Sequence, residues 1–171
     1  MKNQRLLFYF SIITLFLASC TATKSTTSTT KDTNTKDGLT KAQLRTELTR
    51  ECEEYIGTKY KYAGKAPSTG FDCSGFTSYV YDQFNIDLSP SSQNQAVQGK
   101  AIMLSKVKPG DLVFFGEEGK ITHVAMVISN TKEGITVAHS TTSKGVMIQN
   151  ISTSKYWKPK ILFARDIIST N

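Results

Sequence analysis

One cysteine in this sequence stands where a nucleophile would be expected. Cys73 lies in the run Gly-Phe-Asp-Cys-Ser-Gly-Phe at residues 70–76, and apolar residues then recur at helical spacing up to residue 84. The thiol is therefore predicted in the first turn of a helix, where free backbone N–H groups and the helix dipole favour thiolate over thiol. Gly70 and Gly75, on either side, permit close approach of another backbone or of a substrate. A lone cysteine is more often a small buried hydrophobe, so this interpretation requires a base nearby.

Only two histidines, His123 and His139, are available as bases. Each lies in a strand-like segment on a face that is otherwise apolar, with Ala125 and Val127 beside His123. We expect both of these faces to lie against the helices. If the two strands pair with an even residue sum, the rings are neighbours on one face, whereas an odd sum points them apart. The sequence leaves this register open.

Two neighbouring imidazoles beside Cys73 would support covalent catalysis. In that arrangement His123 holds Cys73 as a thiolate and later protonates a leaving amine, while His139 fixes the tautomer and tilt of His123. The backbone N–H of Cys73 is well placed to help stabilise an oxyanion. Such a triad predicts acyl transfer or amide hydrolysis and needs neither a metal nor a cofactor.

The elements that must position these residues are helices followed by strands. A helix is predicted over residues 40–56, with Cys52 on its buried face, and a second begins at Cys73. A polar segment at residues 85–100 is expected to line one side of the cleft, with a short helix at residues 92–97. Five strands separated by turns are predicted at residues 111–115, 122–129, 135–140, 146–150 and 161–167. This order indicates an α+β domain with N-terminal helices packed on a five- to six-stranded antiparallel sheet.

The N-terminal part of the chain has the pattern of an export signal followed by a tether. Residues 1–19 begin with Lys2 and Arg5, continue as a short apolar run and end in Leu-Ala-Ser before Cys20. This end resembles the lipobox of bacterial lipoproteins, which implies a cleaved signal peptide and a membrane anchor of acyl chains, palmitate among them, on Cys20. An uncleaved signal anchor or ordinary secretion is the alternative. Residues 20–38, rich in Thr, Ser and Lys, are predicted to be a flexible tether.

The length of the chain leaves room for one domain, residues 39–171, and its net charge is positive. The formal charge of +7 falls to +5 when the signal and its two basic residues are removed, because that segment holds no acid. This mild excess suits an anionic envelope polymer or lipid surface, and no interleaving of aromatic and basic residues points to nucleic acid. Thr21 stands where an aspartate often retains lipoproteins at the inner membrane, so we expect the outer membrane, on its periplasmic side.

Four motifs follow one another along the chain. They are Phe-Asp-Cys-Ser-Gly-Phe at residues 71–76, Gly-Asp-Leu-Val-Phe-Phe at 110–115, Thr-His-Val-Ala-Met-Val at 122–127 and Ala-His-Ser at 138–140. In order and spacing they resemble the NlpC family of bacterial cell-wall cysteine peptidases, and the resemblance covers residues 55–165. It implies a papain-like α+β fold and cleavage of peptidoglycan stem peptides, typically between D-glutamate and a diamino acid.

The resemblance also implies roles for individual residues. The family's Cys-His-His triad falls on Cys73, His123 and His139. Its tyrosine near the oxyanion site falls on Tyr60, with Tyr62 as a second candidate.

The residues that flank the nucleophile, Asp72 and Ser74, match positions that contact substrate in relatives, and a helix cap is the equal alternative for Asp72. Two departures bear on substrate preference. The basic residue that the family often carries in the cleft is missing from Leu-Ser-Pro-Ser-Ser at residues 88–92, and Ala63 replaces a common glycine. No cell-wall-binding module precedes the predicted domain, so the lipid anchor is expected to do the localising.

Three alternatives stay open beside the peptidase hypothesis. With Cys20 acylated, Cys52 and Cys73 form an even pair that could oxidise to a disulfide. Cys73 and the two histidines could instead hold zinc with an open position, although the short paired ligand spacing of structural zinc sites is absent. A non-catalytic envelope-binding lipoprotein that kept the fold is the third. We predict a monomeric, lipid-anchored peptidoglycan endopeptidase.

Overall fold

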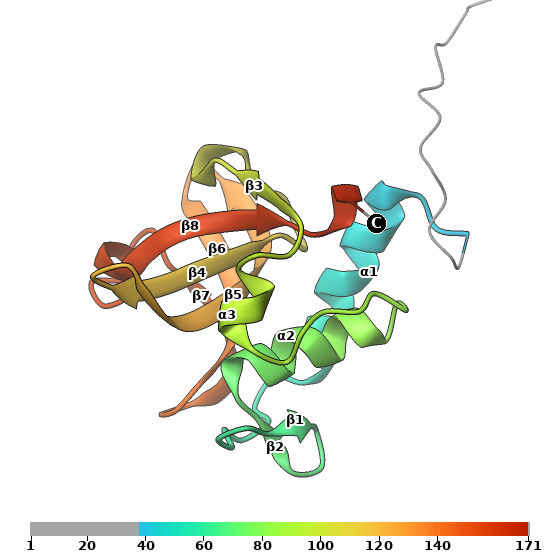
Figure 1. Ribbon diagram of the computed structural model, residues 1–171, viewed down its shortest axis with the longest axis horizontal. Helices are drawn as coiled ribbons and strands as arrows, with labels where there is room; N and C mark the ends of the chain where they lie inside the picture. Colours follow the sequence, from blue (N-terminus) through green and yellow to red (C-terminus); the bar gives the residue numbers. More distant parts are fainter. Residues whose placement is uncertain (1–37, 171) are drawn as a thin grey trace, which may run out of the picture. The chain divides into compact units, whose positions relative to one another are not determined.

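The computed structural model describes residues 38–170 of the chain (Figure 1). The predicted signal peptide, the predicted lipidation site Cys20 and almost all of the predicted tether fall in residues 1–37, outside this range. No helix between residues 38 and 170 is long and apolar enough to cross a membrane.

The first helix, α1 (Lys41–Glu54), begins at a reciprocal cap. The Thr40 hydroxyl accepts a hydrogen bond from the backbone N–H of Gln43, and the Gln43 side chain accepts one from the backbone N–H of Thr40. Cys52 lies on the buried face of this helix. The helix predicted over residues 40–56 is therefore confirmed, with its ends one or two residues shorter.

The second helix, α2 (Cys73–Asp82), begins at the cysteine, as the sequence predicts. Asp72 is its N-cap, and the extended backbone of Asp72 turns the chain directly into the helix. The short α3 (Ser92–Gln95) occupies the first part of the helix predicted at residues 92–97.

The strands form one six-stranded antiparallel sheet in the order β3-β8-β4-β5-β6-β7 (Figure 1). Its strands are β3 (Lys100–Ile102), β4 (Leu112–Glu117), β5 (Lys120–Thr131), β6 (Gly134–Thr141), β7 (Gly145–Asn150) and β8 (Ile161–Asp166). All but the edge strand β3 are predicted from the sequence. A separate hairpin and three 3₁₀ turns complete the domain: β1 (Lys65–Ala66), β2 (Gly70–Phe71), η1 (Leu104–Lys106), η2 (Lys158–Lys160) and η3 (Ile168–Thr170).

Both faces of the sheet are buried, each in its own apolar cluster. The face that carries Phe114 and Met126 packs with the helical residues, among them Leu48 and Phe76. The opposite face carries the odd-numbered residues of β6 and those of β5 as far as Val127. It belongs to a second cluster, which consists of Val107, Val113, Phe115, Ala125, Val127, Ile135, Val137, Ile151 and Ala164, with Trp157 against it. The histidines lie on this second face, so the expectation that their faces lie against the helices is wrong. Because β4 and β5 are apolar on both faces, their alternation does not tell the two sides apart.

A bulge between β5 and β6 decides which way the histidines point. Next to their shared turn the strands pair Ser129 with Thr136, an odd residue sum. Beyond the bulge they pair Val127 with Val137, an even sum, so Ile128 is one extra residue in β5. An extra residue moves every later side chain to the other face. His123 and His139 therefore lie on the same side of the sheet.

A buried ion-pair network ties α1 to the sheet. The Arg45 guanidinium lies 2.7 Å from the carboxylate of Asp111, just before β4, and 2.9 Å from that of Asp166, at the end of β8. Asp111 is fully buried, and its burial raises the pKa of that carboxyl while the hydrogen bond from Arg45 lowers it. The aspartate of the Gly-Asp motif is thus a structural residue of the sheet.

Candidate active site

The turn that leads into Cys73 is held by close backbone packing. Gly75, in the first turn of α2, lies so near the carbonyl oxygen of Gly64 that a Cβ at Gly75 would overlap it. Gly70 has a φ of +105°, and a Cβ there would lie 2.6 Å from the carbonyl oxygen of Lys59. The close approach that the two glycines allow is therefore to another backbone, the segment that carries Tyr60.

Tyr60 is fastened to the strand that precedes the cysteine. Its neighbours bond to both sides of Phe71, with the Lys61 N–H 3.1 Å from the Phe71 carbonyl oxygen and the Phe71 N–H 3.1 Å from the carbonyl oxygen of Lys59. Burial, together with the nearby thiol of Cys73, raises the pKa of Tyr60, so its hydroxyl keeps its proton and can donate a hydrogen bond. Tyr62, the second candidate, is 83% exposed.

The two histidines form a buried hydrogen-bonded pair. Nε2 of His123 lies 3.0 Å from Nδ1 of His139. Burial lowers the pKa of His123 to about 3, with a further contribution from His139, and burial lowers the pKa of His139 to about 4. Both rings are therefore neutral at neutral pH. The pairing uses Nε2 of His123 and leaves its Nδ1 for the thiol.

A tryptophan covers the histidine pair. The Trp157 indole stacks on the His123 ring at 4.5 Å between centroids and an interplanar angle of 28°, and its centroid is 5.0 Å from that of His139. Phe115 packs against His123 from the neighbouring strand. These apolar rings desolvate the imidazoles and fix their planes, which is the physical reason for their low pKa values.

Cys73 rests as a thiol. Burial raises its pKa above the ordinary value and Asp72 acts in the same direction, whereas the backbone N–H of Val124 and those of Ser74 and Cys73 lower it. The expectation that the helix start makes Cys73 a thiolate is therefore wrong for the free protein, because burial outweighs the backbone donors. With a raised thiol pKa beside a neutral imidazole, the proton must move from sulfur to nitrogen as the thiol reacts.

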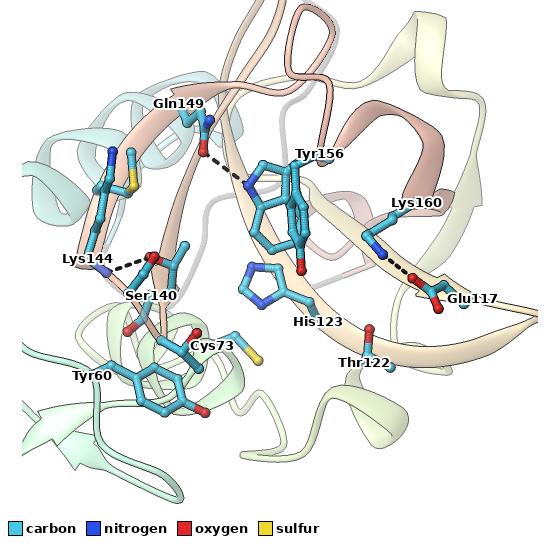
Figure 2. Close-up of a pocket in the computed structure, with 15 residues that line it drawn as sticks. Tyr60, Cys73, Glu117, Thr122, His123, Ser140, Lys144, Gln149, Tyr156 and Lys160 are labelled. Atoms are coloured by element: carbon cyan, nitrogen blue, oxygen red, sulfur yellow. Dashed lines mark hydrogen bonds and ion pairs between the residues drawn. The ribbon is translucent and has the colours of Figure 1, made fainter.

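These residues meet in a cleft of about 560 Å³. In Figure 2 the sulfur of Cys73 and the hydroxyl of Tyr60 point into the cleft beside the ring of His123. Apart from Met147, its other walls are polar and aromatic, formed by Glu117, Thr122, Ser140, Thr141, Thr142, Ser143, Lys144, Gln149, Tyr156, Trp157 and Lys160. None of the residues 85–100 lines it, so the prediction that this segment forms one side of the cleft is wrong. That segment packs instead against α2 and β5, where Gln95 bonds to Thr77 and Gln93 donates to the carbonyl oxygen of Ile121.

The residues flanking the nucleophile are turned away from this cleft. The Asp72 carboxylate accepts from the backbone N–H of Gly75 at 2.6 Å, which is the geometry of a helix cap. Ser74 is buried, and its hydroxyl donates to the carbonyl oxygen of Pro90 at 2.9 Å. Asp72 is thus the helix cap, which was one of the two roles predicted for it beside substrate contact. Contact of Asp72 or Ser74 with substrate stays a prediction.

Two of the alternatives can be compared with this geometry. Cys52 and Cys73 are both free, and the Cys52 sulfur lies 3.5 Å from that of Met126 in the core. A zinc site would need the Cys73 sulfur and both rings directed at one point, but the rings direct nitrogens at each other. Between residues 38 and 170 no three His, Cys, Asp or Glu side chains are grouped as metal ligands.

A thiol at a helix start, beside imidazoles on an antiparallel sheet, is the architecture of a papain-like cysteine peptidase. Residues 57–166 match the NlpC/P60 family, and the chain belongs to that family. The papain-like α+β fold predicted from the sequence is confirmed. Among solved structures, the NlpC/p60 domain of the peptidoglycan hydrolase SagA is 33% identical, with a TM-score of 0.61, over 71% of this chain and 97% of that domain.

Two relatives carry additional sequence. The gamma-DL-glutamyl hydrolase of Bacillus subtilis strain 168 is 38% identical over 138 residues, which are 78% of this chain and 32% of that protein. The murein DD-endopeptidase MepS/murein LD-carboxypeptidase of Escherichia coli K12 is 30% identical over 127 residues, which are 74% of this chain and 64% of that protein. The chain thus spans about a third of the first protein and just under two thirds of the second.

Two cleft residues beside the histidines are absent from the sequence analysis. The Trp157 indole N–H donates to the side-chain oxygen of Gln149 at 3.1 Å, and both residues line the cleft. Trp157 is the only tryptophan in the chain and lies in a turn, where such a residue has little reason to be without a packing partner. The sequence therefore contains a reason to expect Trp157 to pack on a partner, whereas nothing in it marks Gln149 as a cleft residue.

Proposed function

We propose that this protein is a cysteine endopeptidase that hydrolyses peptidoglycan stem peptides through Cys73, His123 and His139. The observation that carries the proposal is the 3.0 Å contact between the two imidazoles, one of which, His123, lines the same cleft as Cys73. Relatives named as a gamma-DL-glutamyl hydrolase and a murein endopeptidase support the choice of substrate.

The first step is attack on the scissile carbonyl carbon. The Cys73 sulfur forms a bond to that carbon while Nδ1 of His123 takes the thiol proton, because neither group carries charge beforehand. The carbonyl oxygen becomes an oxyanion. It is stabilised by the backbone N–H of Cys73, in the first turn of α2, and by the hydroxyl of Tyr60, which keeps its proton.

Collapse of this intermediate breaks the carbon–nitrogen bond. His123, now an imidazolium, gives its proton to the leaving amine, and the acyl group stays on the sulfur as a thioester. Water then attacks the thioester carbon while His123 accepts a proton from it. The carbon–sulfur bond breaks, and His123 gives that proton to the leaving Cys73 sulfur, which releases the carboxylic acid and restores the thiol. His139 keeps the His123 ring in place through both steps by the hydrogen bond to its Nε2.

The bond we propose is that between D-glutamate and the diamino acid. The Bacillus relative, the more similar of the two, is named for glutamyl hydrolysis, whereas the Escherichia coli relative is named as a murein DD-endopeptidase and LD-carboxypeptidase. Lys144 lines the cleft and suits a carboxylate of a stem peptide, whereas Lys160 is paired with Glu117. Asp72 and Ser74 are proposed to contact substrate on the other side of Cys73.

We place the protein at the cell envelope as a monomer, anchored through acylated Cys20 and facing the periplasm from the outer membrane. The support is the sequence alone: a charged start, a short apolar run and Leu-Ala-Ser-Cys at residues 17–20. Metabolic labelling with radioactive palmitate tests it. The wild-type chain should be labelled and Cys20→Ala should not, and equal labelling of both would refute the anchor.

Digestion of purified sacculi by the full-length protein, with fragments identified by mass, tests the activity and the bond together. We expect new amino termini at the diamino acid with the wild type and none with Cys73→Ala. Release of fragments cut elsewhere in the stem peptide would refute the proposed bond but keep the peptidase.

The same preparation separates the two remaining alternatives. No cleavage of any stem peptide by the wild type would favour a non-catalytic envelope-binding lipoprotein. About one equivalent of zinc in purified protein, lost in Cys73→Ser, would favour a zinc site.

A further inference from the structure

Gln149 lies beside the indole of Trp157 and is a neighbour of His139 in the sheet. In the pairing of β6 with β7, Gln149 is opposite Val137 and His139 is opposite Met147. Gln149 and His139 are therefore diagonal neighbours on one face of the sheet, within reach of each other's side chains. Figure 2 shows the Gln149 side chain directed at the indole above His123.

The indole determines which end of the Gln149 amide faces it. Indole Nε1–H is only a donor, so the 3.1 Å contact requires the Gln149 oxygen at Trp157. Trp157 itself is held by its stacking on His123 and by the edge of Tyr156. The amide oxygen is thus fixed in place by a residue whose own orientation is fixed.

His139 has one nitrogen left to satisfy. Its Nδ1 faces His123, while its Nε2 is buried and has no hydrogen-bond partner of good geometry among residues 38–170. A buried N–H without an acceptor is costly, and Gln149 is the polar side chain beside it. Burial has the larger effect on the pKa of His139 and lowers it. Gln149 acts in the opposite direction, as an oxygen that accepts from the ring N–H does.

We propose that Gln149, oriented by Trp157, is a positioning residue that sets the tautomers of both histidines. With the Gln149 oxygen as acceptor, His139 carries its proton on Nε2 and presents a bare Nδ1 to His123. His123 then carries its proton on Nε2, and its Nδ1 is left unprotonated beside Cys73.

This tautomer is the one that the reaction requires. An unprotonated Nδ1 can take the thiol proton, whereas an Nδ1–H could only donate to the sulfur. The opposite chain, in which His139 Nδ1–H donates to His123, would put the proton of neutral His123 on the wrong nitrogen. Gln149 thus becomes a fourth member of the proposed chain of Cys73, His123 and His139. The inference depends on the proposed function only for its catalytic consequence.

Long-range ¹H–¹⁵N NMR of the full-length protein labelled in histidine tests the tautomers directly. Only two histidines are present, so His139→Asn assigns the spectrum. We expect the proton on Nε2 in both rings of the wild type. In Gln149→Met, which keeps the size but removes the acceptor, we expect the Nδ1–H form of His139. A wild-type proton on Nδ1 of either ring, or an unchanged pattern in Gln149→Met, would overturn the proposal.

Kinetics supply a second readout that a purely structural role would not move. Gln149→Met should lower kcat on a stem peptide about tenfold with little change in KM, because part of the base is lost rather than binding. Gln149→Glu restores an acceptor and should recover turnover. Its charge should also raise both histidine pKa values and move the acid limb of the pH–rate profile upward. Equal kcat values in all three proteins would contradict the assignment.

A matched control and a separate outcome keep the two proposals distinct. Gln93→Met makes the same substitution at an exposed residue of α3, outside the cleft, and should change neither spectrum nor rate. If the wild type cleaves no stem peptide, the proposed function fails, but the NMR spectrum still decides the tautomers. If Gln149→Met does not fold, a wild-type proton on Nδ1 of either ring still refutes the assignment, and Gln149→Glu tests it through the upward shift of both histidine pKa values.

Discussion

Nε2 of His123 lies 3.0 Å from Nδ1 of His139, although the strands that carry them leave their shared turn in the register that would separate the rings. Ile128, an extra residue that forms a bulge in β5, shifts the register by one and brings both rings to the same face. The catalytic geometry thus depends on an irregularity of the sheet as well as on the residues that the motifs contain.

His123 and His139 should differ in what their loss costs. His123→Asn removes the base and should lower kcat/KM by about 100-fold or more. His139→Asn keeps a polar side chain that can still orient His123, so we expect a smaller loss, confined mainly to kcat. Steady-state kinetics on a stem peptide measure both. A larger loss in His139→Asn than in His123→Asn would reverse the assigned roles.

Acid should destabilise the folded protein through the same pair. Burial lowers the pKa of His123 to about 3 and that of His139 to about 4, whereas both titrate near 6.5 when unfolded. Below that value the unfolded chain binds protons that the folded chain does not, so the free energy of unfolding falls as pH drops. The slope approaches about 1.4 kcal/mol per pH unit for each histidine.

Urea denaturation between about pH 5 and pH 7, above the range of most carboxylates, measures this slope. His139→Gln should make it shallower, and the surface variant Gln93→Met should not change it. A wild-type free energy of unfolding that stays constant over this range would show that the histidines are not held neutral.

The thiol of Cys73 should be slow to alkylate in the free protein. Its pKa is raised, so the thiolate fraction at neutral pH is small and the rate with iodoacetamide should keep rising above about pH 8.5. Cys52 is fully buried, which makes it a native-state control that should react only on unfolding. Rapid alkylation of Cys73 that is constant between about pH 6 and pH 8 would instead indicate a preformed thiolate–imidazolium pair.

The backbone contact beneath the nucleophile should tolerate no side chain. Gly75→Ala places a Cβ on the carbonyl oxygen of Gly64, and we expect a loss of about 1–3 kcal/mol in the free energy of unfolding. The Tyr60 segment moves with Gly64, so activity should fall as well. Ser78→Ala on the same helix is the control and should stay within about 0.5 kcal/mol of the wild type. Equal stabilities would mean that this contact is not tight.

Local signals in the sequence account for much of this structure. The helix start at Cys73 is predictable because an acid cap and helical spacing coincide there, and β5 and β6 are predictable because apolar residues alternate between turns. The strand β3 is not, since its three residues are largely exposed and carry no alternation.

The register could not be read from the sequence for a physical reason. The turn after Thr131 favours one pairing, and nothing in the identity of Ile128 marks it as the residue that bulges. The burial of the histidine face is equally hidden, because the segments that cover it come from the turns before β4, which carry Val107, and after β7, which carry Trp157. Both features arise from contacts between residues far apart in the chain.

The most direct test of the account compares hydrolysis of a defined stem peptide by the wild-type protein and by Cys73→Ala, with the products identified by mass. The account predicts that the wild type cuts between D-glutamate and the diamino acid, and that Cys73→Ala is slower by at least about 10³-fold while unfolding at the same urea concentration. Cleavage by Cys73→Ala at the wild-type rate would contradict it.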